Sequence, residues 1–83
     1  LAVIFGKYNI RINTINSGGV LKIKNSKIIS PSKKFIKRYS KNTPLKRMAT
    51  AKEIASVALF LSSDASSYIT GTNIMVDGGW TSV

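Results

Sequence analysis

Two strand-like segments separated by helical pattern constrain this fold more than any other feature of the chain. In residues 9–16, Ile10 and Ile12 alternate with polar residues, and residues 72–76 form a second short apolar strand. Strands joined by helical crossovers pair in parallel through a right-handed connection. Parallel sheets are covered on both faces and rarely consist of two strands. We therefore expect an α/β fold with further strands upstream, so that this chain is the tail of a longer protein.

Helical pattern is present before the first strand and again between the two strands. Residues 1–8 are typical of the end of a helix. Pro31 predicts the first turn of a second helix, which has Ser30 as its cap and ends near Lys41. Between the first strand and this helix, residues 20–30 have little periodicity, and we predict a mobile loop there.

The clearest local pattern follows a predicted connector over residues 42–48. Thr50 and Glu53 have the spacing of a capping box, in which the hydroxyl and the carboxylate each bind the backbone amide of the other residue. The helix that follows is apolar on nearly all sides, with Leu59 and Phe60 flanking its main apolar face. Such a helix needs a second contact, either another layer of the same chain or another subunit.

Composition excludes several classes of protein. With 83 residues the chain makes at most one small domain, and no stretch reaches the roughly 20 apolar residues of a membrane span. There is no cysteine and no histidine, which removes disulfides, thiolate chemistry, and the commonest general base and metal ligand. We therefore expect no metal site and no membrane association.

The net charge of +10 raises the alternative of a nucleic-acid-binding module. The basic residues run from Lys7 to Lys52, and only three residues are acidic. A surface for single-stranded nucleic acid interleaves aromatic side chains with the lysines, whereas Tyr39, Tyr68 and Trp80 are scattered among different segments. Solvated surface lysines on a globular scaffold are therefore the favoured interpretation.

The sequence IRINTINSGG, followed by TPLKRMATAKEIASVALFLSSDASSYITGTNIMVDGGW, resembles the carboxyl-terminal part of the short-chain dehydrogenase/reductases. The resemblance covers nearly the whole chain and is weakest over residues 21–30. It rests on several motifs that occur together in family order: Arg-x-Asn at the first strand, Pro-Leu-x-Arg-Met, Glu-Ile-Ala, Ser-Asp-x-x-Ser-x-x-Thr-Gly and Val-Asp-Gly-Gly.

The resemblance implies a Rossmann-type doubly wound parallel sheet, in which residues 9–16 are the sixth strand and residues 72–76 the seventh. Residues 1–83 would then be the carboxyl-terminal segment of one NAD(P)-binding domain. In the family, the last strand and the helix before it commonly meet their counterparts in a second subunit. A cytoplasmic homo-oligomer, a dimer or a tetramer, is therefore implied, and packing within the chain is the alternative for its candidate interface residues Leu59, Phe60, Ile74 and Val76.

The resemblance also implies what residues 1–83 do not contain. The glycine-rich phosphate loop, the catalytic serine, and the tyrosine and lysine spaced four apart would all precede Leu1. Tyr8, Tyr39 and Tyr68 have no lysine four residues later. We therefore expect no catalytic residue in this chain, which alone would be inactive.

One cofactor-binding element is implied, and it comprises Ser17, Gly18, Gly19 and Val20. In the family, Pro-Gly follows the sixth strand, and the backbone of a residue just after it holds the carboxamide of NAD or NADP; Val20 fits this position. Ser17 stands where proline is usual, and Lys22 stands where threonine is common, which removes a hydroxyl partner. These departures argue against tight cofactor binding. Without the family, Ser-Gly-Gly is typical of an ordinary strand-ending turn.

Residues 20–43 correspond to the substrate loop and lid helix of the family, and such loops often become ordered around a ligand. Phe35, Ile36 and Tyr39 would either face a small alcohol or carbonyl substrate or pack on the sheet, and packing is the favoured role for each residue. Asn13 is expected to anchor neighbouring backbone through its side-chain amide.

Three functions remain from the sequence. The first is the carboxyl-terminal part of an NAD(P)-dependent oxidoreductase, which transfers hydride between nicotinamide and an alcohol or carbonyl substrate. This chain would contribute a nicotinamide clasp, a substrate lid and a subunit interface. The second is a basic nucleic-acid-binding module. The third is a non-catalytic interaction fragment or remnant, which would pair with intact subunits through its last helix and strand.

Overall fold

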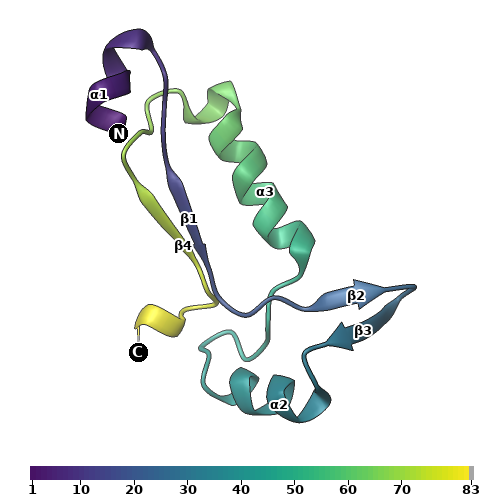
Figure 1. Ribbon diagram of the computed structural model, residues 1–83. Helices are drawn as coiled ribbons and strands as arrows, with labels where there is room; N and C mark the ends of the chain where they lie inside the picture. The colour runs from purple at the N-terminus through teal and green to yellow at the C-terminus, as the bar shows by residue number, and fades with distance from the viewer. Residues whose placement is uncertain (83) are drawn as a thin grey trace.

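The computed structural model describes residues 1–82 as a parallel strand pair with a helix beside it and a hairpin projecting from one end (Figure 1). The longest helix runs alongside the strand pair, and a shorter helix lies below the hairpin. In chain order the elements are α1 (Ala2–Phe5), a 3-10 turn (Gly6–Tyr8), β1 (Thr14–Ser17), β2 (Lys22–Lys24), β3 (Lys27–Ser30), α2 (Lys33–Lys41), α3 (Ala51–Ser62), a 3-10 turn (Asp64–Ser66), β4 (Asn73–Val76) and a 3-10 turn (Trp80–Ser82).

The expected parallel pairing of the two distant strands is confirmed. β1 and β4 are parallel, with Thr14 opposite Asn73 and Ser17 opposite Val76. The first strand begins later than residue 9, because the backbone before Thr14 contacts the bend that precedes β4 rather than a neighbouring strand: the Ile12 carbonyl accepts from the Gly71 N–H at 2.8 Å. The Ile12 N–H donates to Thr70 Oγ1 at 3.0 Å. Within residues 1–82 the parallel sheet therefore consists of two strands, β1 and β4.

Asn13 anchors the backbone before β4, as its side-chain amide predicts. Its Nδ2 donates to the Ile69 carbonyl at 3.0 Å, and its Oδ1 accepts from the Thr72 N–H at 3.0 Å. The side chain thereby fixes both the carbonyl and the amide at the entry of the last strand.

The Arg11 guanidinium joins the end of α3 to the same bend. Its Nη2 donates to the carbonyls of Leu61 at 2.9 Å and Ser63 at 3.3 Å, and its Nη1 donates to the Ile69 carbonyl at 3.1 Å. The last carbonyls of a helix have no partner within the helix, and a cation is favourable there. One side chain therefore satisfies the end of α3 and fixes the bend that leads to β4.

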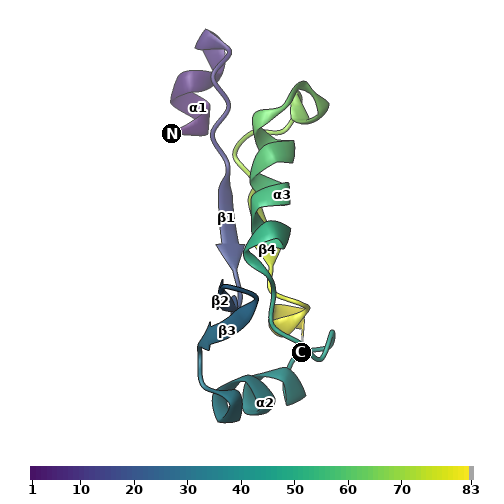
Figure 2. The ribbon, with the colours of Figure 1, turned by 90° about the vertical axis from the view of Figure 1, so that its right-hand side faces the viewer.

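The two faces of the strand pair differ in polarity. Ile15 and Ile74 are neighbours and half-buried, and Ile15 lies beside Ala58 and Leu61 of α3; Figure 2 shows α3 running alongside both strands. On the opposite face the side chains bind one another. The acceptor is Asn73 Oδ1, which receives hydrogen bonds from Thr14 Oγ1 at 2.9 Å and Asn16 Nδ2 at 2.7 Å.

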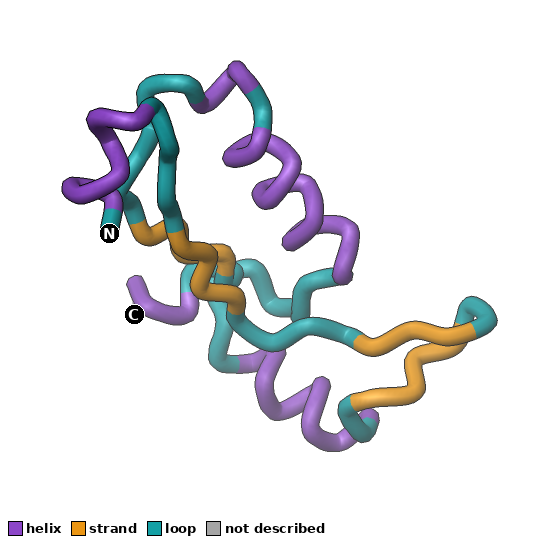
Figure 3. The backbone as a smooth tube through the Cα atoms, turned by 45° about the horizontal axis from the view of Figure 1, so that its top comes forward, coloured by secondary structure: helices purple, strands orange, loops and turns teal. Residues whose placement is uncertain are grey.

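Residues 20–30 form a hairpin rather than the predicted mobile loop. β2 and β3 are antiparallel, with Lys24 opposite Lys27, and Figure 3 shows them as a strand pair separate from β1 and β4. The turn residues Asn25 (φ +53°) and Ser26 (φ +62°) both adopt the left-handed conformation. Two such residues are typical of a tight hairpin turn, and asparagine tolerates this region well. The short run Lys22-Ile23-Lys24, in which isoleucine alternates with lysine, is therefore a strand.

The cap of α2 is Ser32 rather than the predicted Ser30. The helix begins at Lys33, and Ser32 Oγ accepts from the Phe35 N–H at 3.2 Å. Pro31 therefore precedes the helix, because Ser32 has the extended backbone of a cap, with φ −63° and ψ 155°. The predicted end near Lys41 is confirmed.

Apolar side chains are little buried within residues 1–82. Met48, which is 4% exposed, is the buried apolar side chain of this part of the chain. On α3, Leu59 is 73% exposed and Phe60 is 44% exposed. The expectation that α3 is too apolar to be covered on one side only agrees with these exposures.

Candidate functional site

The backbone of Gly18–Val20 leaves the carboxyl end of β1 and is held from three directions. The Gly18 N–H donates to the Val76 carbonyl at 2.9 Å, which continues the ladder with β4. The Gly19 N–H donates to the Tyr39 hydroxyl at 2.6 Å. The Gly19 carbonyl accepts from the Ala49 N–H at 2.9 Å. Ligands bind in open α/β sheets at this carboxyl end of the strands.

Val20 forms a parallel bridge to Ala49 that leaves its own backbone groups free. The two hydrogen bonds of the bridge are made by the neighbours of Val20: Ala49 donates to Gly19, and Leu21 donates to Ala49 at 2.8 Å. In a parallel bridge the N–H and C=O of the middle residue point away from the partner strand. Within residues 1–82 these two groups of Val20 have no backbone partner. The N–H and C=O of Val20 are thus a neighbouring donor and acceptor that could bind the two polar groups of a planar amide in a ligand.

The two glycines before Val20 are required by close neighbours. A Cβ on Gly18 would lie 2.8 Å from Tyr39 Oη and 2.9 Å from Asp77 Cα. A Cβ on Gly19 would lie 2.8 Å from Met48 Cε and 2.9 Å from Cζ of the stacked Tyr39 ring. Separations this short do not occur between real Cβ atoms and their neighbours, so only glycine lets these segments approach. Ser17, the remaining residue of the predicted element, ends β1 and is exposed.

The predicted lid residues of α2 divide into two environments. Tyr39 and Ile36 are half-buried, whereas Phe35 is 46% exposed. Tyr39 stacks between two other aromatic rings: its ring centroid lies 4.8 Å from that of Trp80 and 6.0 Å from that of Phe35. The structure therefore joins Tyr39 and Trp80, which the sequence separates, and their faces cover each other rather than standing open.

The connector after α2 holds the most buried residues of the site, which sequence reasoning did not single out. Thr43 is 1% exposed, and its Oγ1 donates to the Ser40 carbonyl at 3.2 Å. Met48 packs against Gly19. The Leu45 N–H donates to the Gly78 carbonyl at 3.1 Å. The sequence pattern that could have found them is the Thr-Pro-Leu-x-Arg-Met motif of residues 43–48. These residues form a packed segment, here called the strap, which joins α2, the turn at Gly18 and Gly19, and the end of β4.

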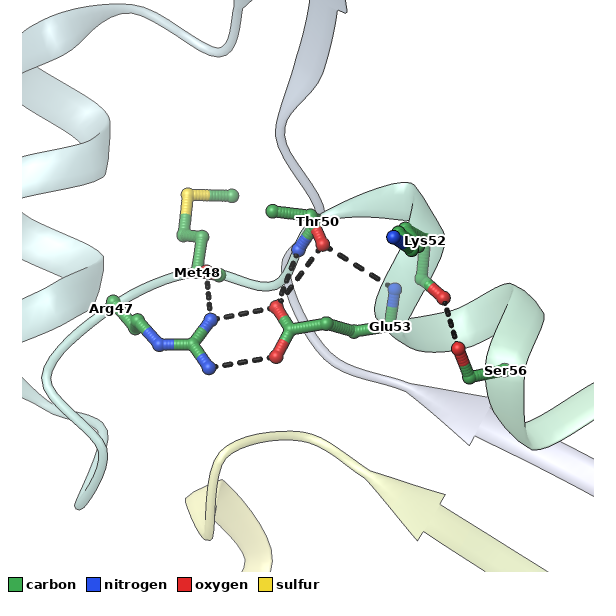
Figure 4. Close-up of polar contacts among 6 residues, drawn as sticks. All are labelled: Arg47, Met48, Thr50, Lys52, Glu53 and Ser56. Carbon is green, nitrogen blue, oxygen red and sulfur yellow. Dashed lines mark hydrogen bonds and ion pairs between the residues drawn. The ribbon is translucent and has the colours of Figure 1, made fainter.

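The capping box of α3 is confirmed and is extended by Arg47 (Figure 4). Thr50 Oγ1 accepts from the Glu53 N–H at 3.3 Å, and Glu53 Oε1 accepts from the Thr50 N–H at 3.0 Å. The Arg47 guanidinium binds both Glu53 oxygens at 2.7 Å each. Arg47 Nη1 also donates to the Met48 carbonyl at 3.3 Å. The start of α3 is thereby tied to the strap that packs on Gly19.

The Glu53 carboxylate is expected to make the stability of the protein sensitive to acid. The hydrogen bonds from Arg47 and from the Thr50 backbone lower the pKa of Glu53 from its ordinary value to about 2. A lowered pKa stabilises the folded protein above the unfolded value of about 4.3, and this stabilisation is lost as the pH falls toward the folded value. Urea unfolding of the full-length protein should therefore show a steeper loss of stability from pH 5 to pH 2 than in the Glu53→Gln variant.

Asp77 remains in both proteins of that comparison, so its own titration cancels. Hydrogen bonds from the Thr81 hydroxyl and from the N–H groups of Gly79 and Thr81 also lower the pKa of Asp77. Parallel pH profiles for the wild-type protein and Glu53→Gln would contradict the assignment of acid sensitivity to Glu53. These contacts of Asp77 fix the turn after β4, and this turn leads into the 3-10 turn that begins at Trp80.

The four candidate interface residues lie in two places. Leu59 and Phe60 are exposed on α3, whereas Ile74 and Val76 are half-buried on the face of the strand pair that α3 covers. In this structure Leu59 and Phe60 are therefore open to another chain, whereas α3 partly covers Ile74 and Val76.

The basic residues gather on the hairpin and α2, where eight of the thirteen lie between residues 22 and 41. Within residues 1–82 one ion pair is found, between Arg47 and Glu53. In the same residues no cluster of acidic side chains could hold a metal ion. No helix in this part of the chain is long and apolar enough to cross a membrane.

Comparison with known proteins gives a family match over residues 1–81, to the family described as Enoyl-(Acyl carrier protein) reductase. D-arabinitol 2-dehydrogenase [ribulose-forming] of Candida tropicalis is 43% identical over 81 residues, which are 96% of this chain and 29% of that protein. NADH-dependent L-xylulose reductase of Ambrosiozyma monospora is 39% identical, over 99% of this chain and 30% of that protein. The chain thus spans less than a third of the length of these curated relatives.

Solved structures give the same match. A short chain dehydrogenase family protein from Francisella tularensis superposes with a TM-score of 0.84 and 34% identity, over 100% of this chain and 38% of that one. 4-Hydroxyisoleucine dehydrogenase complexed with NADH superposes with a TM-score of 0.79 and 32% identity, over 99% of this chain and 32% of that one. The arrangement of β1, the strap, α3 and β4 therefore recurs within larger α/β proteins.

Proposed function

Because the chain belongs to the short-chain dehydrogenase/reductase family, we propose that it forms the carboxyl-terminal part of an NAD(P)-dependent oxidoreductase. The reaction is hydride transfer between the nicotinamide and a small alcohol or carbonyl substrate. Support comes from the relatives, which include an arabinitol dehydrogenase and a xylulose reductase.

The free backbone of Val20 carries this proposal. A nicotinamide carboxamide has an NH2 donor and a C=O acceptor in one plane, and the Val20 carbonyl and N–H offer the complementary pair. The residues present therefore fit the cofactor, which when bound supplies the hydride acceptor or donor. Val20 would orient its carboxamide, and the lid helix α2 would help to exclude water from the site. NADH in the related 4-hydroxyisoleucine dehydrogenase complex supports this choice of ligand.

The exposed pair Leu59 and Phe60 supports a subunit interface on α3. Apolar side chains this exposed on a helix are typical of a surface that another chain covers. The proposed assembly is a homo-oligomer, in which α3 meets its counterpart. A monomer in light scattering of the full-length protein would contradict it.

The test of the cofactor clasp uses a variant that removes one donor and no internal hydrogen bond. Val20→Pro lacks the Val20 N–H, which has no backbone partner in residues 1–82. In the full-length protein it should weaken NADH or NADPH binding by up to roughly tenfold, the effect of one lost hydrogen bond. ADP-ribose, or its 2′-phosphate for NADPH, lacks the nicotinamide and should bind as tightly as to the wild type. Equal cofactor affinity in both proteins would contradict the clasp.

A further inference from the structure

The Tyr39 hydroxyl joins the lid helix to the backbone just before the clasp. It accepts from the Gly19 N–H at 2.6 Å, from a residue twenty positions earlier in the chain. Gly19 immediately precedes Val20, whose backbone groups form the proposed clasp. A side chain of α2 therefore holds the peptide next to the clasp.

The Tyr39 ring is itself fixed in place by its neighbours. It stacks on Trp80 with an interplanar angle of 14° and on Phe35 with an angle of 26°. Trp80 begins the last 3-10 turn, after the Asp77 turn that follows β4. Aromatic stacking of this kind stabilises the ring beyond the area that it buries. The hydroxyl is thus held by contacts from both α2 and the end of β4.

The Tyr39 phenol also accounts for the second glycine of Ser-Gly-Gly. A Cβ on Gly19 would lie 2.9 Å from Tyr39 Cζ, and a Cβ on Gly18 would lie 2.8 Å from Tyr39 Oη. The pair of glycines lets the phenol approach, but it also leaves the peptide between them free to rotate when no partner holds it. The Tyr39 hydroxyl supplies that partner.

We propose that Tyr39 is a positioning residue for the nicotinamide clasp, because its hydroxyl fixes the Gly19 amide and so supports, from the side opposite the Ala49 bridge in the chain, the backbone groups of Val20. The proposal rests on the proposed function, since it needs Val20 to bind the cofactor. It adds a link between the lid and the cofactor. If docking of α2 orders the clasp, then cofactor on the clasp favours docking of α2 by the same free energy.

The test measures two ligands against two tyrosine variants of the full-length protein. Tyr39→Phe keeps the stacked ring and removes the hydroxyl. It should weaken binding of the nicotinamide cofactor roughly three- to tenfold, the effect of one hydrogen bond, and leave ADP-ribose binding unchanged. Tyr68→Phe is the matched control, because Tyr68 is fully exposed and should change neither affinity. Trp80→Phe keeps the hydroxyl with a smaller stack, and we expect a smaller loss confined to the cofactor.

The other outcomes separate the positioning role of Tyr39 from the proposed function. Equal weakening of both ligands by Tyr39→Phe would mean that the hydroxyl only supports the fold, and unchanged cofactor binding would mean that it does not order the clasp. Either result overturns the positioning role and leaves the proposed function intact. If the wild-type protein binds the cofactor no more tightly than ADP-ribose, the clasp itself fails, and the proposed function is revised first.

Discussion

Replacing Arg11 by alanine should lower the free energy of unfolding by about 2–4 kcal/mol. The guanidinium donates to three carbonyls, at Leu61, Ser63 and Ile69. Its removal leaves partly buried carbonyls without a donor, each costing roughly 1–3 kcal/mol where water does not replace it. It also removes the cation from the end of α3. Urea unfolding of the full-length protein, followed by circular dichroism, measures the change.

Arg38→Ala is the matched control for this substitution. Arg38 is exposed in the last turn of α2, and no hydrogen bond of its guanidinium is found in residues 1–82. The expected change is within about 0.5 kcal/mol, as for other surface substitutions. If the two arginine variants lose the same stability, the loss at Arg11 reflects charge or helix propensity rather than the three carbonyls.

Gly79→Ala should destabilise the protein by about 2–4 kcal/mol. Gly79 has φ +92°, a conformation that a side chain strains. An added Cβ would also lie 2.7 Å from Pro44 Cγ and 2.9 Å from Pro44 Cβ. Pro44 belongs to the strap, and its ring cannot rotate away from Gly79. The substitution therefore combines backbone strain with overpacking.

Gly6→Ala separates those two causes from the general effect of replacing a glycine. Gly6 has φ −58° and ψ −38°, and a Cβ there would meet nothing within 4 Å. Alanine at such a position should stabilise the protein by about 0.5–1 kcal/mol. Thermal unfolding of the two variants should therefore shift in opposite directions, and a loss of stability at both positions would contradict the role of Pro44.

The parts of the fold that the sequence predicts are those decided by local chemistry or by sheet topology. The capping box needed only Thr50 and Glu53 at their spacing, and both hydrogen bonds are present. Parallel pairing of residues 72–76 with the first strand followed from the helices between them, and it is present as β1 and β4. The side-chain amide of Asn13 could satisfy backbone at the start of a strand, and it does.

The parts that sequence reasoning missed depend on contacts between distant residues. The ring of Trp80 meets Tyr39 only after the strap has brought the end of β4 close to α2. The burial of Thr43 and Met48 has the same origin. The hairpin was missed for a different reason: its turn, Asn25-Ser26, lacks the glycine that usually marks two left-handed residues, so nothing in the sequence separated two strands within residues 20–30.

The polar contacts on the open face of the strand pair fix the register of β4 against β1. Asn73 Oδ1 receives hydrogen bonds from two residues of β1, one on each side of Ile15. A slip of β4 by one residue would turn every side chain to the other face. Ile74 would then face outward, and the Asn73 amide would be pressed beneath α3 without Thr14 or Asn16. An asparagine on an exposed face thus decides which way a half-buried isoleucine points.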